Sequence, residues 1–315
     1  MAQRTWTFDA PSGTFKNHTL SSDLRAAAIE ITRFMQFVRP EPGFGKKMGE
    51  TITITRLADI NVPTNARITE GQRIPEDDIT LTTVSVTVAE WGRSVPYTNL
   101  EQDLSKFEPS NLIQRKLRDQ MSRSLDIGAA DAFKAGQIKA IPDGTSSIVF
   151  DTDGVASTTA LANLNVFHVE RIRDQMFGDL RIPPLDNDYV CIASTKALRG
   201  IKDDPTWEEW HKYTGPEVKF NGEVGRLEGI RFIETNHFAA LSNSQGSGGV
   251  LGEAVFFGED AVIMAVAEDP ELRAEIPADF GRKKSLAWYG ILEFLQTWGD
   301  SANAGEARVI HLTSL

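Results

Sequence analysis

Apolar and polar residues alternate with a period of two in two separate stretches of the chain. In both stretches, isoleucine or valine alternates with threonine or serine; the apolar positions are Ile52, Ile54, Val84, Val86 and Val88. This period is typical of a β-strand with one apolar face. Residues 62–81 carry prolines, a glycine and an acidic run, as loop tips do. The pattern predicts one long β-hairpin over residues 50–97, with Trp91 and Tyr97 extending its second strand.

A two-stranded hairpin of this length cannot cover its own apolar face. At roughly 3.3 Å per residue the ribbon reaches several tens of ångströms. An isolated ribbon of this kind is marginally stable in water. The rest of the chain or a neighbouring copy can supply the cover, and the alternation fits both.

A second period, of three to four residues, predicts helices. The strongest helix is expected over residues 110–139, where apolar residues recur every four positions and charges of both signs occupy the other face. Further helices are expected over residues 21–38, 163–177 and 207–213, and directly after Ser194 or Thr195.

Short apolar runs predict strands over residues 189–193, 230–234, 254–257, 261–267, 286–298 and 308–312. Glycine and serine dominate residues 242–249, which predicts a flexible loop. Three glycines within residues 43–49 predict a hinge between an N-terminal arm and the body. Strands and helices do not alternate regularly and no repeat is present, so the expected fold class is mixed α+β.

Composition excludes several classes of protein. The net charge of −11 over 315 residues is unlike that of proteins that coat nucleic acid, which gather lysine and arginine on one face. No uncharged run approaches the roughly 18 residues of a membrane helix, and secretion is not expected. The single cysteine, Cys191, lies in an apolar run, which predicts folding in a reducing cytoplasm without an internal disulfide.

Residues that would carry catalysis or bind a cofactor are not grouped in the sequence. The five histidines are dispersed, and none has a second histidine, a cysteine or a carboxylate at metal-ligand spacing. Residues 246–252 are rich in glycine but lack the lysine and the helix of a phosphate-binding loop. Cys191 has the apolar neighbours of an inert thiol. We therefore expect no catalytic, cofactor-binding or metal site and no enzymatic activity.

Several motifs, taken in their order along the chain, resemble a known family. They are residues 49–57 (GETITITRL), 69–71 (TEG), the strand of residues 84–98 that ends in VPYT, and residues 203–210 and 220–235. Together they resemble the major capsid proteins of tailed bacteriophages, and most of all those of N-four-type short-tailed phages. The fold of that family is shared with the floor of herpesvirus capsids.

The resemblance implies a division of the chain into parts. Residues 1–49 would be an N-terminal arm and residues 50–97 an extended hairpin, the E-loop, that lies over an adjacent subunit. Residues 98–188 would form a peripheral domain with a spine helix, and residues 189–267 an axial domain. Residues 268–315 would return to the peripheral domain.

The resemblance also implies a function and partners. The chain would be a structural subunit that self-assembles into pentamers and hexamers and forms the icosahedral shell of the virion, after synthesis in the host cytoplasm. Its partners would be further copies of itself, a separate scaffolding protein, a portal, a decoration protein and packaged double-stranded DNA, which is enclosed without sequence-specific binding; no membrane is involved.

Three charged residues near the expected hairpin tip, Arg67, Glu70 and Arg73, are candidate subunit-interface residues. Charged side chains on a protruding loop are either solvated or paired across a contact, and both alternatives stay open. Two other functions also stay open: the shell protein of a bacterial nanocompartment with the same fold, and a cytosolic enzyme with an unrecognised site.

Overall fold

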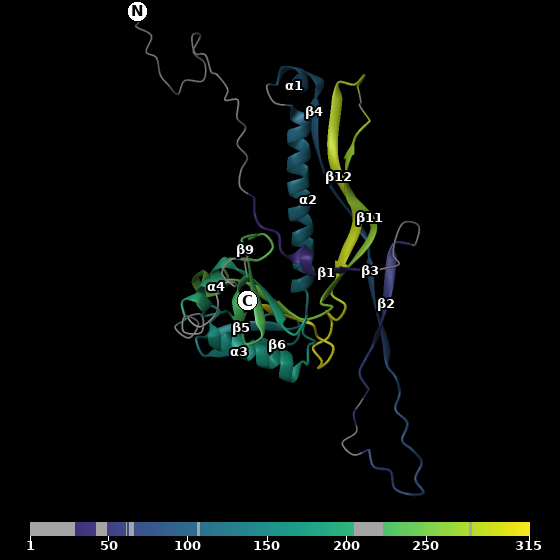
Figure 1. Ribbon diagram of the computed structural model, residues 1–315, viewed down its shortest axis with the longest axis vertical. Coiled ribbons are helices and arrows are strands. Elements are labelled where there is room, and N and C mark those ends of the chain that lie inside the picture. The colour runs from purple at the N-terminus through teal and green to yellow at the C-terminus, as the bar shows by residue number, and fades with distance from the viewer. Residues whose placement is uncertain are drawn as a thin grey trace, which may run out of the picture.

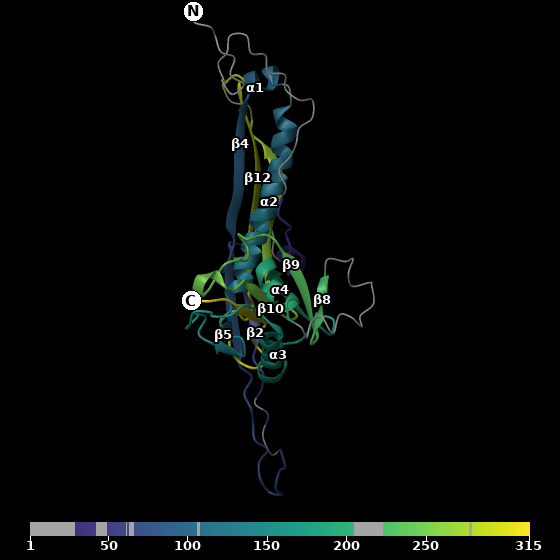
Figure 2. The ribbon, with the colours of Figure 1, turned by 90° about the vertical axis from the view of Figure 1, so that its left-hand side faces the viewer.

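A seven-stranded sheet, a four-stranded sheet and a two-stranded hairpin hold the strands of the described part of the chain (Figure 1). The structure is a computed structural model that describes residues 29–41, 49–60, 62, 66–105, 108–204, 223–276 and 279–315. The four-stranded sheet and a long helix rise together as an arm from the body that holds the seven-stranded sheet (Figures 1 and 2). The hairpin extends in the opposite direction. The expected mixed α+β class is confirmed.

Helix α2 (Pro109–Lys134) runs the length of the arm. Proline occupies its first turn, where a missing backbone N–H removes no helical hydrogen bond. Its buried side chains include Leu117, Leu125 and Phe133. The helix ends five residues before the predicted end at residue 139, because the chain there enters strand β5 (Lys139–Gly144). The shorter helix α1 (Asn99–Leu104) precedes α2 at the far end of the arm.

The four-stranded sheet packs along α2. Its order is β1 (Val38–Pro40), β11 (Val262–Ala274), β12 (Lys283–Leu295) and β4 (Ala89–Thr98). The prediction that residues 91–97 extend the hairpin was wrong, since β4 pairs with β12 over ten residues. After the hairpin the chain therefore enters the arm, where β4 forms an edge of the sheet.

The seven-stranded sheet forms the core of the body. Its order is β6 (Ser147–Asp151), β5, β13 (Val309–Leu312), β10 (Ala254–Phe257), β7 (Tyr189–Ser194), β9 (Ile230–Thr235) and β8 (Glu223–Leu227). The central strands β7, β10 and β13 are buried along their whole length. Strands were predicted at all three places. Such continuous apolar runs are typical of strands covered on both faces.

The two faces of this sheet contact different helices. Cys191 and Ala193 of β7 face a core that also contains residues of α3 (Val166–Asp174) and α4 (Thr195–Lys202). The π-helical turn η2 (Gln175–Asp179) continues α3, and the short helix η4 (Ser247–Gly249) lies in the loop before β10. Val190 and Ile192 of β7 face a second core, which joins the sheet to α2 and to the four-stranded sheet. The body and the arm therefore share one core.

The predicted helix over residues 21–38 was wrong in its described part. Residues 34–37 form the 3₁₀ turn η1 (Phe34–Phe37), and β1 follows at once. The Phe34 side chain is fully buried and packs its ring 5.5 Å from that of Phe133. Tertiary contacts thus override the helical period. Residues 1–28, the predicted hinge at 43–48 and the predicted helix at 207–213 lie outside the described residues.

The loop of residues 242–249 is held by specific hydrogen bonds, although its composition predicted flexibility. The Ser242 carbonyl accepts from the Glu253 backbone N–H, and the Asn243 side chain accepts from the Lys196 backbone N–H at 2.8 Å. Gln245 and Leu251 form a β-bridge. These bonds hold the loop against the body. In the described ranges, no helix is long and apolar enough to cross a membrane.

Candidate functional site

The described residues of the hairpin's outer part project from the body and are exposed. Strands β2 (Thr51–Leu57) and β3 (Leu81–Thr87) pair antiparallel, with Ile54 opposite Val84, as the alternation predicted. Beyond them, residues 58–80 extend away from the body, and all those described after Ala58 are exposed (Figure 1, Figure 2). Leu57 and Leu81 form the last cross-strand pair.

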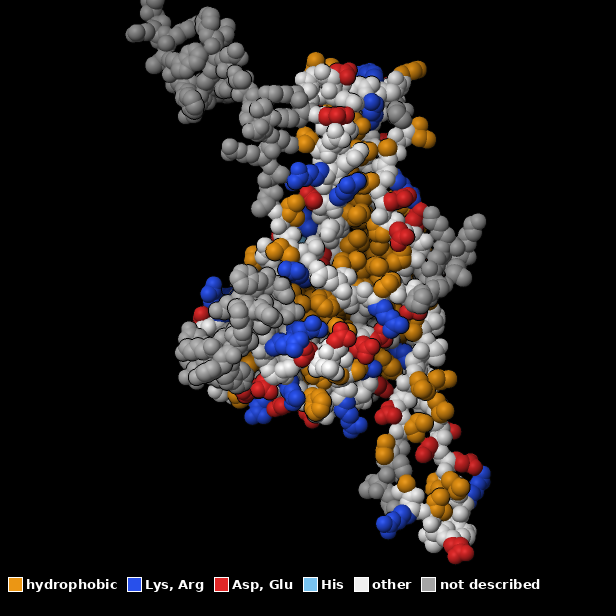
Figure 3. All heavy atoms as spheres, viewed as in Figure 1, with side chains coloured by type: hydrophobic (Ala, Val, Ile, Leu, Met, Phe, Trp, Pro, Cys, Tyr) orange, Lys and Arg blue, Asp and Glu red, His pale blue; other side chains and the backbone are white. Residues whose placement is uncertain are grey.

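Large apolar side chains line this projection without cover. They are Leu57, Ile60, Val62, Ile68, Ile74, Ile79 and Leu81, whose side chains are between 44% and 80% exposed. Figure 3 shows orange side chains along the hairpin down to its tip. Among the described residues of the hairpin, cover is confined to the root, where Val86 is buried. The body therefore covers the apolar side chains at the root of the hairpin. The described apolar side chains of its outer half are not covered by the described residues of their own chain.

Arg56 anchors the root of the hairpin to the end of the arm's sheet. Its guanidinium donates to the Thr297 carbonyl at 2.9 Å and to both carboxylate oxygens of Asp300, at 2.5 and 3.1 Å. It also lies 4.8 Å from the centre of the Trp298 ring. The hydrogen bond to Asp300 raises the pKa of Arg56, and the same bond lowers the pKa of Asp300.

Arg56 was not among the residues predicted to be functional, although the alternation contained a signal for it. Residues 52, 54 and 56 lie on one face of β2, so the apolar face of the strand ends in a cation. A buried arginine requires hydrogen-bond partners in the fold. The arginine therefore marks the point where the hairpin is fixed to the body.

We expect Arg56→Met to loosen the hairpin without unfolding the body. The substitution keeps most of the apolar stem and removes the hydrogen bonds, each of which contributes about 1.5–3 kcal/mol when one partner is charged. Limited proteolysis within residues 58–80 should become faster than in the unaltered chain. Arg73→Met serves as the control, because Arg73 is exposed and, among the described residues, pairs with Glu76 of the same loop. Equal cleavage rates in both variants would contradict the anchoring role.

The three predicted interface residues lie together in the hairpin tip. Arg67, Glu70 and Arg73 are all exposed, around a turn in which Gly71 has a positive φ of 88°. Arg67 and Arg73 line a small hollow in the tip. The Arg73 guanidinium donates to Glu76 within the same loop. A role of these residues between subunits stays a prediction.

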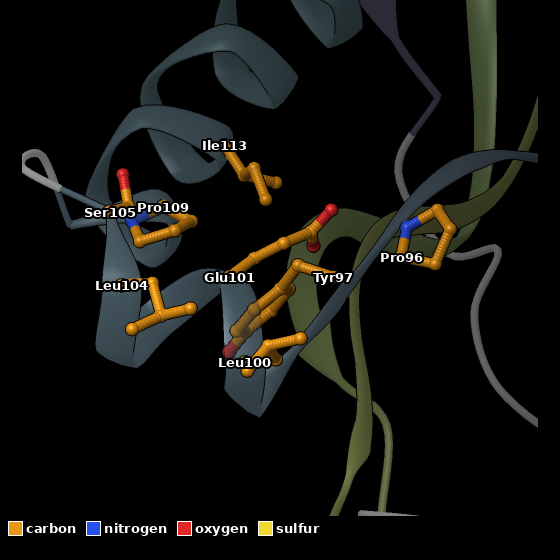
Figure 4. A pocket seen from close by; sticks show the side chains of 8 residues that line it. All are labelled: Pro96, Tyr97, Leu100, Glu101, Leu104, Ser105, Pro109 and Ile113. Atoms are coloured by element: carbon orange, nitrogen blue, oxygen red, sulfur yellow. The ribbon is translucent and has the colours of Figure 1, made fainter.

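A second uncovered apolar surface lies at the far end of the arm (Figure 4). It is an open groove of about 570 Å³ between the end of β4, α1 and the first turn of α2, lined by Pro96, Tyr97, Leu100, Glu101, Leu104, Ser105, Pro109 and Ile113. Thr98 and Glu101 form a reciprocal capping box that fixes the start of α1. Leu100 and Leu104 are 68% and 77% exposed. Both ends of the elongated molecule therefore carry uncovered apolar side chains.

Solved structures with this architecture are known. No family model and no curated protein matches the sequence. The acid-stable capsid of Helicobacter pylori bacteriophage KHP30 gives a TM-score of 0.70 at 11% identity over 98% of each chain. The capsid of cyanophage Pam1 gives 0.68 at 16% identity, over 96% of this chain and 97% of the other. The capsid of Ralstonia phage GP4 gives 0.66 at 14% identity, over 98% and 97%.

The chain has the fold of tailed-phage capsid proteins. The match covers nearly the whole length of both chains, so it includes the hairpin, the arm and the body. At these identities the likeness concerns the fold. It agrees with the fold that the motif order predicted, while the N-four-type affinity stays a prediction.

Three buried titratable residues form a chain inside the body of this capsid fold. The Lys139 ammonium donates to the Lys134 carbonyl at 2.6 Å and lies 3.3 Å from Nδ1 of His311. The other ring nitrogen of His311, Nε2, lies 2.6 Å from a carboxylate oxygen of Glu253. A neutral His311 satisfies both contacts, because Nε2–H donates to the carboxylate while Nδ1 accepts from the ammonium.

The surroundings of Lys139, His311 and Glu253 shift the pKa values of all three side chains downward. Burial lowers the pKa of His311, against the effect of the hydrogen bond to Glu253. Burial also lowers the pKa of Lys139. For Glu253, burial raises the pKa, but the hydrogen bond from His311 and further charge contacts outweigh it, and the net shift is downward. The ammonium, the neutral ring and the carboxylate therefore form one matched set.

We expect this set to make the free energy of unfolding fall with acidification. A histidine whose folded pKa is depressed contributes stability above its ordinary pKa of 6.5, and the contribution is lost as the pH falls. The depressed pKa of Glu253 adds a loss below its ordinary value of 4.5. His311→Gln should flatten the decline between pH 7 and 5 in urea titrations. His168, whose pKa burial also lowers, stays in both proteins and supplies the remaining slope. An unchanged slope would contradict the role of His311.

Proposed function

We propose that this chain is a structural subunit that assembles with copies of itself into the icosahedral shell of a phage virion, around the phage DNA. The observation that carries the proposal is the hairpin, whose outer half presents apolar side chains that the described residues of its own chain leave uncovered. A neighbouring copy, over which this E-loop lies, would cover them. The likeness to phage capsid structures supports the same role.

The sheets suggest how the subunit is divided. We assign α1, α2 and the four-stranded sheet to the peripheral domain, with α2 as the spine helix, and the seven-stranded sheet with α3 and α4 to the axial domain. Strand β4 then belongs to the peripheral domain, although residues 50–97 were expected to form the E-loop. Strands β5, β6 and β13 join the axial sheet from outside the expected range 189–267.

The proposed partners follow from the shell. Further copies in pentamers and hexamers would contact the hairpin and the ends of the arm. A scaffolding protein, a portal and a decoration protein are proposed from the same role. The net charge of −11 suits a wall that encloses DNA without adhering to it. The nanocompartment alternative shares the fold, but the matching structures named above are phage capsids.

Electron microscopy and sedimentation of the purified full chain test the proposal. The chain should be expressed alone and together with the genes that neighbour it. We expect pentamers, hexamers or closed icosahedral shells in at least one of these preparations. A stable monomer or dimer at high concentration in every preparation, with residues 58–80 protected from protease, would show that the hairpin is covered within one chain and would overturn the proposal.

A further inference from the structure

A fully buried carboxylate, that of Asp126, lies on the inner side of α2. One of its oxygens, Oδ1, accepts from the backbone N–H groups of Arg33, Phe34 and Met35, at 3.0, 2.8 and 3.4 Å. The other oxygen, Oδ2, lies 3.0 Å from Nδ1 of His237, which donates to it. One side chain thus receives donors from two segments that are 90 or more residues away in the sequence.

The residues before η1 depend on side chains for their hydrogen bonds. The N–H groups that donate to Asp126 lie at the start of the turn η1. Backbone donors at this place have no partner within the turn. Two residues earlier, the Ile31 N–H donates to the Asn236 side chain at 2.7 Å. The Ile31 carbonyl accepts from the Thr235 hydroxyl at 3.1 Å. Residues 31–35 are thus bound to α2 on one side and to the loop after β9 on the other.

We propose that Asp126 is a latch that couples two docking events: that of residues 31–35, which lead out of the N-terminal arm, and that of the loop of residues 235–241. The two segments bind to α2 together and leave it together. The physical reason is that either departure leaves the buried carboxylate short of donors, which costs free energy that the remaining segment cannot supply. Coupling of this kind is reciprocal between the two segments.

Residues 30–35 make other contacts that do not involve Asp126. Glu30 and Arg123 form an ion pair at 2.9 Å, but both side chains are more than a third exposed, so the pair contributes little. The Phe34 ring packs against Phe133 in the shared core. Loss of the latch therefore loosens residues 31–35 while the aromatic contact and the fold remain. The inference concerns a single subunit, so it stands or falls independently of shell assembly.

Hydrogen exchange of the unassembled full chain, followed by mass spectrometry, tests the coupling. Asp126→Leu removes every acceptor and should speed exchange about tenfold or more in peptides that cover residues 31–37 and 235–241. Asp126→Asn keeps an acceptor for the N–H groups of residues 33–35. Its side-chain amide can also donate to the other tautomer of His237, so this variant should keep most of the protection. Asp131→Asn is the matched control, because Asp131 lies on the same helix, is 63% exposed and, among the described residues, pairs with Lys134.

His237→Phe supplies the decisive readout and does not depend on the folding of the leucine variant. Thr235 and Asn236 bind Ile31 directly, but no described hydrogen bond joins residues 235–241 to residues 33–37, so a purely local role would loosen residues 235–241 and Ile31 alone. The latch predicts faster exchange in residues 33–37 as well, whose donors bind Asp126. Faster exchange confined to residues 235–241 and Ile31, or an Asp126→Leu protein that exchanges like Asp131→Asn, would overturn the proposal.

Discussion

Replacement of residues 58–80 by an Asn-Gly turn should give a folded chain that no longer assembles into shells. Leu57 and Leu81 are directly opposite each other, so a two-residue turn can close the shortened hairpin. The removed segment carries five exposed large apolar side chains, Ile60, Val62, Ile68, Ile74 and Ile79. Full burial of one such side chain contributes about 1.5–3 kcal/mol. If a hairpin that lies on a neighbouring subunit loses about 4 kcal/mol of such burial in total, the association of the two subunits weakens about 1000-fold.

Sedimentation velocity and electron microscopy measure this effect, and circular dichroism checks that the shortened chain is folded. Leu161→Ser serves as the control, because Leu161 is 60% exposed but lies outside the hairpin. The control protein should assemble like the unaltered chain. Normal shells from the shortened chain would show that the hairpin contributes nothing to the interface.

Phe133→Ala should lower the free energy of unfolding by about 3–5 kcal/mol, the range for a fully buried phenylalanine. The Phe133 ring lies 4.7 Å from that of Phe257 and 5.5 Å from that of Phe34, so it joins α2, β10 and η1. The surrounding core contains residues of both large sheets. A cavity here has walls from three elements that are each held in place by other contacts, and collapse around it is limited.

Denaturant titration gives the size of this effect. The control, Phe177→Ala, removes a ring that is 60% exposed and packs on Arg173, so a change below about 1 kcal/mol is expected. Both variants remove the same kind of side chain, which is fully buried at position 133 and mostly exposed at position 177. Equal losses in the two proteins would show that Phe133 does not hold the body and the arm together.

Local periodicity was sufficient for the hairpin, the long helix and the buried strands. The alternation around Ile54 and Val84 predicted the antiparallel pair that the structure contains, and the run of residues 254–257 predicted β10. In these segments the residues that determine the element are neighbours in the sequence, and the period of their apolar side chains follows from the geometry of a strand or a helix. The same alternation shows Arg56 as an exception on an apolar face.

Contacts between distant residues decided the rest. Residues 34–38 end the segment 21–38 whose period predicted a helix, but the Phe34 ring and the Asp126 carboxylate fix them as a turn and the start of a strand. Strand β4 left the hairpin because β12, nearly 200 residues later, offers it ten paired positions. Lys139, His311 and Glu253 carry no shared signal in the sequence, and the sheet brings them together. Single-sequence periodicity reports only the burial pattern within one element, whereas the partner of a strand or a buried charge is chosen by packing across the whole fold.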